Sequence, residues 1–181
     1  TIAYGTTDAS TTHYDYYDSG LLNSTTTAYL TAFAATTTYF YDSRGRPTYT
    51  QYPDGTTTNQ FYDPMPTTPG WKNSTLDQAG VMTSYMYDAV GRLDQLDVSA
   101  VDIQSGQTLH HISNYEYDAA NRLTDSYDPL NNHISFTYYP TGQMQTSTSW
   151  FDANTSYTTI YDYNLAGEQV SVEDANGHIT Q

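Results

Sequence analysis

The sequence predicts an all-β protein made of tandem β-hairpins that pair into one continuous antiparallel sheet. Three observations support this prediction. A Tyr-x-Tyr-Asp motif recurs along the 181 residues, turn-forming residues recur at two places in each repeat, and strand-favouring residues are abundant, with 20 Tyr and 31 Thr. No segment shows the 3.6-residue apolar period of an amphipathic helix, so we expect almost no helix.

The Tyr-Asp repeat is clearest in three segments, which span residues 39–47, 85–93 and 115–123. Aligning weaker copies on them gives seven central tyrosines, separated by 25, 21, 25, 30, 21 and 25 residues. The residues that define the repeat are Tyr16, Tyr41, Asp42, Gly45, Arg46, Tyr62, Asp63, Tyr87, Asp88, Gly91, Arg92, Tyr117, Asp118, Arg122, Tyr138, Gly142, Tyr163 and Gly167. Such regularity predicts one supersecondary unit per repeat.

Each repeat carries two turn signals, and strands of roughly 6–9 residues fit between them. The first turn has Gly or Asn shortly after the Tyr-Asp pair, where positive φ is tolerated. The second has hairpin sequences such as Pro53-Asp54-Gly55. In the long repeat after Tyr87 both arms are extended, as paired strands require.

Two roles follow for the motif residues themselves. The Asp after each central tyrosine is predicted to accept hydrogen bonds from nearby backbone amides, in preference to binding a metal. The two rings of Tyr-x-Tyr lie on one face of a strand, so we expect tyrosines of successive repeats to stack on one another across the sheet.

These motifs resemble the RHS/YD-repeat family, the tyrosine-aspartate repeat proteins of bacterial toxin shells, wall-associated proteins and cell-surface proteins. The resemblance rests on YFYDSRGRP, YMYDAVGRL and YEYDAANRL and runs from Tyr39 to the C-terminus. Residues 1–38 are interpreted as degenerate repeats, and 39–181 as repeats centred on Tyr41, Tyr62, Tyr87, Tyr117, Tyr138 and Tyr163, the last one open at the C-terminus. The resemblance implies a long sheet of hairpins that coils into a spiral. In toxin complexes such repeats form a hollow shell around a toxic cargo, and in other members they lie on cell surfaces, where adhesion and carbohydrate binding are implied.

Composition bounds the partners. Twenty acidic against five basic residues give a net charge of −15, which disfavours nucleic acid and anionic membranes as partners. The chain has no cysteine, so a disulfide framework or thiol nucleophile is excluded. No apolar run is long enough to predict a membrane-inserted segment.

The sequence offers no catalytic constellation. Nucleophile-elbow, zinc-protease and phosphate-loop motifs are missing, and the adjacent His110 and His111 would point to opposite faces of a strand. We therefore expect no enzymatic activity, no cofactor and no metal site. Trp71 and Trp150 could stack on sugars, although packing against neighbouring hairpins is the preferred interpretation. Asn23, Asn73 and Asn154 begin N-glycosylation triplets for a secreted chain.

The leading hypothesis is a secreted or cell-surface structural protein that assembles through edge pairing of hairpins. The next tyrosine of the pattern would fall just beyond Gln181, which suggests head-to-tail pairing with further repeats or other copies into a filament. Two alternatives stay open. One is an adhesion module that binds carbohydrate or a cell surface, and the other is a segment of a toxin-encapsulating RHS shell.

Overall fold

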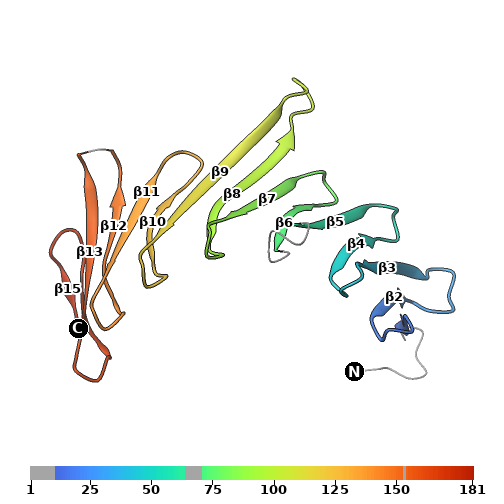
Figure 1. Cartoon of the computed structure of the whole chain (residues 1–181), viewed down its shortest axis with the longest axis horizontal. Coiled ribbons are helices and arrows are strands. Elements are labelled where there is room, and N and C mark those ends of the chain that lie inside the picture. The colour runs from blue at the N-terminus through green and yellow to red at the C-terminus, as the bar shows by residue number, and fades with distance from the viewer. Residues whose placement is uncertain (1–10, 64–70, 153) are drawn as a thin grey trace. The chain divides into compact units, whose positions relative to one another are not determined.

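The computed structural model describes residues 11–63, 71–152 and 154–181, and within them the protein is all-β, as predicted. Fifteen antiparallel strands form one open sheet whose hydrogen-bonded order follows the order of the chain (Figure 1). No helix occurs in the described ranges, so none of their segments is a helix that could cross a bilayer.

Each strand pairs with the strand before it and the strand after it in the chain. Their bounds are β1 His13–Tyr16, β2 Leu22–Thr27, β3 Ala35–Tyr41, β4 Pro47–Gln51, β5 Thr57–Tyr62, β6 Lys72–Leu76, β7 Met82–Tyr87, β8 Leu93–Val101, β9 Thr108–Tyr117, β10 Leu123–Tyr127, β11 His133–Tyr138, β12 Met144–Trp150, β13 Ser156–Tyr163, β14 Gln169–Glu173 and β15 Ile179–Thr180. The strands β8 and β9 are the long arms predicted for the repeat after Tyr87, and Gly106 lies in the turn between them with a φ of 69°.

A β-bulge follows the central tyrosine in hairpin after hairpin, and the sequence did not reveal it. Tyr41 lies opposite Pro47 while Phe40 lies opposite Tyr49, which leaves Thr48 without a partner in the ladder. The same shift occurs at Tyr16, Tyr62, Tyr117, Tyr138 and Tyr163. A bulge bends its strand and increases the twist, so the sheet is bent at the same position of each of these six hairpins.

The described residues form a single layer without a buried apolar core. The most buried residues are small and polar, namely Ser24, Thr26, Ser99 and Thr148, which are 8–9% exposed. Threonine hydroxyls pair across the strands, with 2.9 Å between Thr26 and Thr36 and 2.9 Å between Thr148 and Thr158. The high threonine content therefore serves cross-strand pairing, and packing depends on contacts between neighbouring hairpins.

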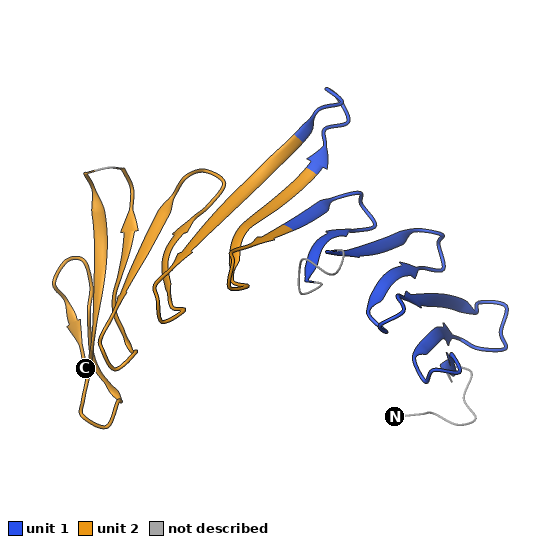
Figure 2. Cartoon of the chain, in the orientation of Figure 1, with its two compact units in different colours: residues 1–84, 100–108 blue, residues 85–99, 109–181 orange. Residues whose placement is uncertain are grey.

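The chain divides into two compact units, coloured separately in Figure 2. Unit 1 comprises residues 1–84 and 100–108, and unit 2 comprises residues 85–99 and 109–181. The far ends of β8 and β9 thus group with unit 1, and the rest of these strands with unit 2. This division concerns compactness, so the boundary predicted at residue 38 from repeat quality stays a prediction.

Candidate functional site

The aspartate of the Tyr-Asp pair organises the first turn of the repeat. Asp88 Oδ1 accepts hydrogen bonds from the backbone amides of Val90 (3.0 Å) and Arg92 (2.9 Å). The turn closes through Asp88 N to Arg92 O (2.9 Å) and Gly91 N to Asp88 O (3.1 Å), with Gly91 at a φ of 93°. Asp42 and Asp118 repeat this pattern, which confirms the predicted turn role of the motif aspartate.

The same carboxylates also bind an arginine four residues later. Arg92 Nε lies 2.6 Å from Asp88 Oδ2, and the corresponding distances are 2.7 Å for both Arg46–Asp42 and Arg122–Asp118. The hydrogen bond from the Arg92 backbone amide is the main reason that the pKa of Asp88 lies below its ordinary value of 3.8, with partial desolvation acting in the opposite direction. The carboxylate is thus ionised at neutral pH and orients the guanidinium.

Each oriented guanidinium lies over the central tyrosine of the next hairpin. The distances from guanidinium carbon to ring centroid are 4.1 Å for Arg46–Tyr62, 4.9 Å for Arg92–Tyr117 and 4.6 Å for Arg122–Tyr138. These distances fall within the range of a cation–π contact. We call this arrangement the Asp–Arg–Tyr junction, and it joins one hairpin to its successor.

The tyrosine of the junction returns a hydrogen bond to the hairpin before it. The hydroxyl of Tyr117 donates to Leu93 O at 3.0 Å, that of Tyr138 to Leu123 O at 2.7 Å, and that of Tyr62 to Pro47 O at 2.9 Å. Burial raises the pKa of Tyr117 and of Tyr138 above the ordinary value, so these phenols remain protonated donors.

Two other junctions use tyrosine in place of aspartate. The turn hydrogen bonds from Tyr17 N to Leu21 O and from Tyr139 N to Gln143 O, both 2.9 Å, place Tyr17 and Tyr139 at the Asp position of the turn. Leu21 and Gln143 therefore occupy the Arg position. We call these two sites the tyrosine junctions.

The rings at the tyrosine junctions meet edge to face. The centroids of Tyr17 and Tyr41 are 6.2 Å apart with planes at 88°, and those of Tyr139 and Tyr163 are 6.1 Å apart at 86°. The predicted contact between tyrosines of successive repeats therefore occurs at these two junctions, between a central tyrosine and the tyrosine at the Asp position of the preceding turn. At the Asp–Arg–Tyr junctions an arginine lies over the central tyrosine instead.

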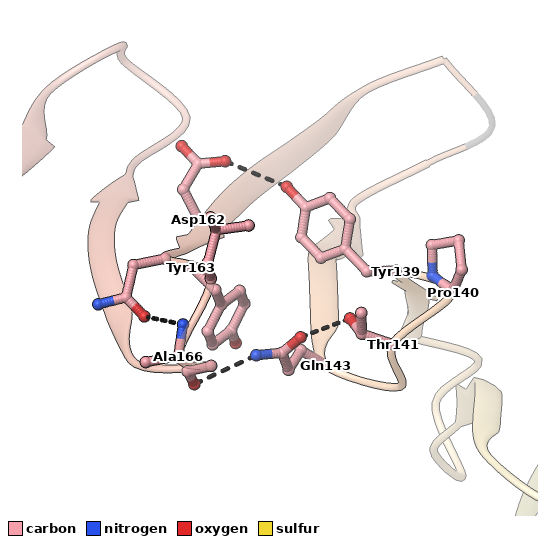
Figure 3. Close-up of a pocket in the computed structure, with 10 residues that line it drawn as sticks. Tyr139, Pro140, Thr141, Gln143, Asp162, Tyr163 and Ala166 are labelled. Atoms are coloured by element: carbon pink, nitrogen blue, oxygen red, sulfur yellow. Dashed lines mark hydrogen bonds between the residues drawn. The ribbon is translucent and has the colours of Figure 1, made fainter.

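An open cleft lies at each tyrosine junction. In unit 2 a cleft of about 620 Å³ is lined by the residues of two neighbouring turns, among them Tyr139, Pro140, Asp162 and Tyr163 (Figure 3). The Tyr139 hydroxyl donates to Asp162 Oδ1 at 3.1 Å, and Gln143 Nε2 donates to Gly167 O at 3.1 Å, so that both hydrogen bonds cross from one hairpin to the next.

The corresponding cleft of unit 1 measures about 420 Å³. Its walls include Tyr17, Asp18, Leu21, Phe40 and Tyr41. Two equivalent places in the repeat thus carry an aromatic, acid-edged cleft. In the sequence, the signal for these clefts is that Tyr replaces the motif Asp and that Leu or Gln replaces the motif Arg. Sequence reasoning missed that these replacements amount to the loss of an Asp–Arg–Tyr junction.

The other predicted residues have local roles. Trp150 lies parallel to His133 of the paired strand β11 (centroids 5.8 Å apart, planes at 9°), and its Nε1 donates to Ser135 Oγ at 3.0 Å, so its ring is packed on that strand. Among the described residues, no group of three or more His, Cys, Asp and Glu side chains is arranged to hold a metal ion.

The three asparagines of the predicted glycosylation triplets differ in accessibility. Asn154 lies in an exposed turn, whereas Asn23 and Asn73 lie half-buried on β2 and β6. Asp63 N donates to Trp71 O at 2.9 Å, which places Trp71 beside Asp63 just before β6, and residues 64–70 lie outside the described residues.

Comparison with known proteins shows the fold. No protein-family model matches the sequence, and no curated protein matches it. A crystal structure of TcdB2-TccC3-Cdc42 is 16% identical, with a TM-score of 0.59 over 94% of this chain and 10% of that chain. Crystal structures of TcdB2-TccC3, with and without its hypervariable C-terminal region, align with TM-scores of 0.55 and 0.53 at 15% and 16% identity, over 96% of this chain and 12% of theirs.

The name TccC3 also occurs in a structure of the Photorhabdus luminescens Tc holotoxin pore, which aligns with a TM-score of 0.45 at 13% identity, over 93% of this chain and 13% of that chain. The present chain spans about a tenth of the length of the structures it matches. At these identities the likeness shows the fold alone, an all-β arrangement of paired antiparallel strands.

Proposed function

We propose that this chain is an architectural, non-enzymatic segment of an RHS/YD-repeat wall, in which hairpins join edge to edge into a larger sheet. The observation that carries the proposal is the Asp–Arg–Tyr junction. Around Arg92 the guanidinium donates to Asp88 at 2.6 Å and lies 4.9 Å from the Tyr117 ring centroid, and the Tyr117 hydroxyl donates to Leu93 O at 3.0 Å. The most regular charged groups of the repeat are therefore engaged in holding hairpins together. Groups bound in this way serve assembly and are poorly placed for catalysis.

The open sheet supports the same function. Strands β1 and β15 are its two edges, and an edge strand presents backbone groups that can pair with a further strand. Repeat proteins of this kind gain stability from each neighbour that is added. The missing apolar core of the described layer fits a protein whose stability depends on such neighbours.

Among the possible assemblies, we favour a segment of a toxin-encapsulating shell over a filament of separate copies. The fold similarity to TcdB2-TccC3 chains, of which this chain spans about a tenth, supports the shell. An extracellular or cell-surface location belongs to the same proposal. Carbohydrate adhesion through Trp150 has less support, because that ring is packed against His133.

Electron microscopy and mass photometry of the purified chain, over a range of concentrations, test edge pairing. We expect association that is weakened by Ile179→Lys, which places a charge on the edge strand β15, but not by Ile103→Lys in an exposed turn. Association into curved or closed particles supports the shell, whereas long uniform fibres support the filament. A strictly monomeric chain, unaffected by either substitution, would contradict assembly through the sheet edge.

A further inference from the structure

We propose that the two tyrosine junctions are binding sites for arginine side chains of a basic partner protein. Each cleft would take one guanidinium group, in the place that Arg46, Arg92 and Arg122 fill at the Asp–Arg–Tyr junctions. This inference goes beyond the architectural role and does not depend on it, because it concerns groups inside each unit and not the sheet edges.

The Asp–Arg–Tyr junctions define what holds a guanidinium in this repeat. Besides the ring of the next hairpin, Arg92 Nη1 donates to Asp118 O at 2.9 Å and to Asn121 Oδ1 at 3.0 Å, which are acceptors of the next turn. Arg122 Nη1 likewise donates to Tyr139 O at 3.2 Å. Apart from the aspartate of its own turn, which Tyr17 and Tyr139 replace at the tyrosine junctions, the guanidinium is held by two elements of the next hairpin, a tyrosine face and the first carbonyl of the following turn.

Both elements persist at the tyrosine junctions. Tyr41 and Tyr163 are the central tyrosines there, and the equivalent carbonyls belong to Asp42 and Asn164. Each of these carbonyls accepts the amide that closes its own turn, from Gly45 at 3.0 Å and from Gly167 at 3.0 Å. A carbonyl oxygen has a second lone pair, as Asp118 O shows by accepting both its turn amide and Arg92.

The residues at the Arg position leave space in the clefts. Gln143 is shorter than arginine and uncharged, and its amide ends on Gly167 O at 3.1 Å. Leu21 is apolar and lies beside Gly45. The clefts of about 620 and 420 Å³ remain open next to them.

Charge selects a cation as the occupant. Asp162 is exposed at the edge of the unit 2 cleft, where its carboxylate accepts hydrogen bonds from the neutral hydroxyls of Tyr139 and Ser171 and has no cationic partner among these contacts. Asp18 is exposed at the edge of the unit 1 cleft. Asp42 also lines the unit 1 cleft, but its carboxylate is already bound to Arg46. Together with the net charge of −15, these carboxylates favour a guanidinium over a neutral ligand. Arginine is preferred to lysine because its planar guanidinium can stack on an aromatic ring while its N–H groups donate hydrogen bonds within the guanidinium plane.

A separate partner is a better source than a second copy of this chain. Arg46, Arg92 and Arg122 are bound to their own aspartates, so Arg44 is the arginine that a second copy could present. Two copies would also bring together chains that each carry a net charge of −15. We therefore assign the clefts to a basic partner with exposed arginines.

The test is an NMR titration of the whole chain with N-acetyl-arginine amide, compared with the lysine analogue and the neutral citrulline analogue. Arginine should shift the signals of both clefts, with Tyr163, Gln143 and Gly167 reporting on one, and Tyr41 and Leu21 on the other. Citrulline should bind about tenfold more weakly, since it keeps the shape and loses the charge. Equal shifts with arginine and citrulline would overturn the proposal.

A charge-neutral double variant, Tyr139→Asp with Gln143→Arg, fills the unit 2 cleft from within the chain. It should abolish the shifts at Tyr163 while the unit 1 cleft still responds, so the untouched cleft serves as an internal control for folding. The matched control is Tyr157→Asp with Gln104→Arg, at exposed positions outside both clefts. Unchanged binding at Tyr163 in the filled variant would contradict the site.

Two further measurements keep the proposal testable if the double variant does not fold. Asp162→Asn retains the cleft and should weaken arginine binding there several-fold, by loss of the edge charge. Shifts at both clefts that grow with protein concentration alone, and disappear in Arg44→Ala, would instead assign the clefts to a second copy and overturn the separate partner.

Discussion

The Asp–Arg–Tyr junctions and the tyrosine junctions both join one hairpin to the next, but they do so through different side chains. Both share the turn hydrogen bonds, the bulge and a central tyrosine in the following hairpin. At Arg122 the space between hairpins is filled by a guanidinium held between Asp118 and Tyr138, whereas at Gln143 two tyrosine rings meet edge to face beside a cleft. The residues at the Asp and Arg positions therefore distinguish a closed junction, filled by a guanidinium, from an open junction with a cleft, while the turn hydrogen bonds stay the same.

The largest expected effect comes from removing the ring of a closed junction. Tyr117→Ala loses the cation–π contact with Arg92 and the hydroxyl bond to Leu93 O, and we expect about 2 kcal/mol of lost unfolding free energy for this half-buried ring. Tyr117→Phe keeps the ring and should lose about 1 kcal/mol. Urea unfolding followed by circular dichroism measures both, and equal losses would mean that the ring face contributes nothing.

A smaller effect is expected from turning a closed junction into an open one. Arg92→Gln copies the residue at Gln143 and removes a partly exposed cation from Tyr117, which should cost about 0.5–1 kcal/mol. The reverse change in the double variant Tyr139→Asp with Gln143→Arg should be stabilising by a similar amount. Destabilisation in both directions would show that each junction depends on its own surroundings and that the two are not interchangeable.

The smallest effect is a dependence on acid. The folded pKa of Asp88 and of Asp118 lies below the unfolded value, chiefly through the backbone amides of Arg92 and Arg122, so the folded state favours the ionised form. Their contribution to stability is therefore present above about pH 4 and is lost as the pH falls through the folded pKa. Melting temperatures should fall on acidification, and less so in Asp88→Asn, which copies the residue at Asn164. An identical pH profile for the variant would contradict this role of Asp88.

The sequence predicted the strands and turns of this protein more fully than the contacts between its side chains. Repeat spacing and turn residues predicted the hairpins, the long β8 and β9 arms and the turn role of Asp42, because turn chemistry is local. The bulge was missed, since nothing marks Thr48 as the unpaired residue. The partners of the central tyrosines were missed because register and hairpin length decide which side chains of neighbouring hairpins meet.

The arginine of the motif illustrates the same limit. Its spacing of four residues from Asp88 was visible, and so was its recurrence at Arg46 and Arg122. Its second partner, a tyrosine 25 residues further on in the case of Arg92 and Tyr117, depends on how far the intervening hairpin carries the chain before it returns. The open clefts could not be predicted from the sequence either, because they depend on the space that Leu21 and Gln143 leave at the Arg position.

The role of the Asp–Arg–Tyr junction is tested most sharply by a pair of double-mutant cycles, one at Arg122–Tyr138 and one at Gln143–Tyr163. Each cycle combines an alanine at the first position with a leucine at the tyrosine, and the coupling free energy is measured by urea unfolding. We predict a coupling free energy of about 0.5–1 kcal/mol at Arg122–Tyr138 and a value near zero at Gln143–Tyr163. Equal couplings at the two sites would contradict the claim that the Asp–Arg–Tyr junction is what closes one hairpin onto the next.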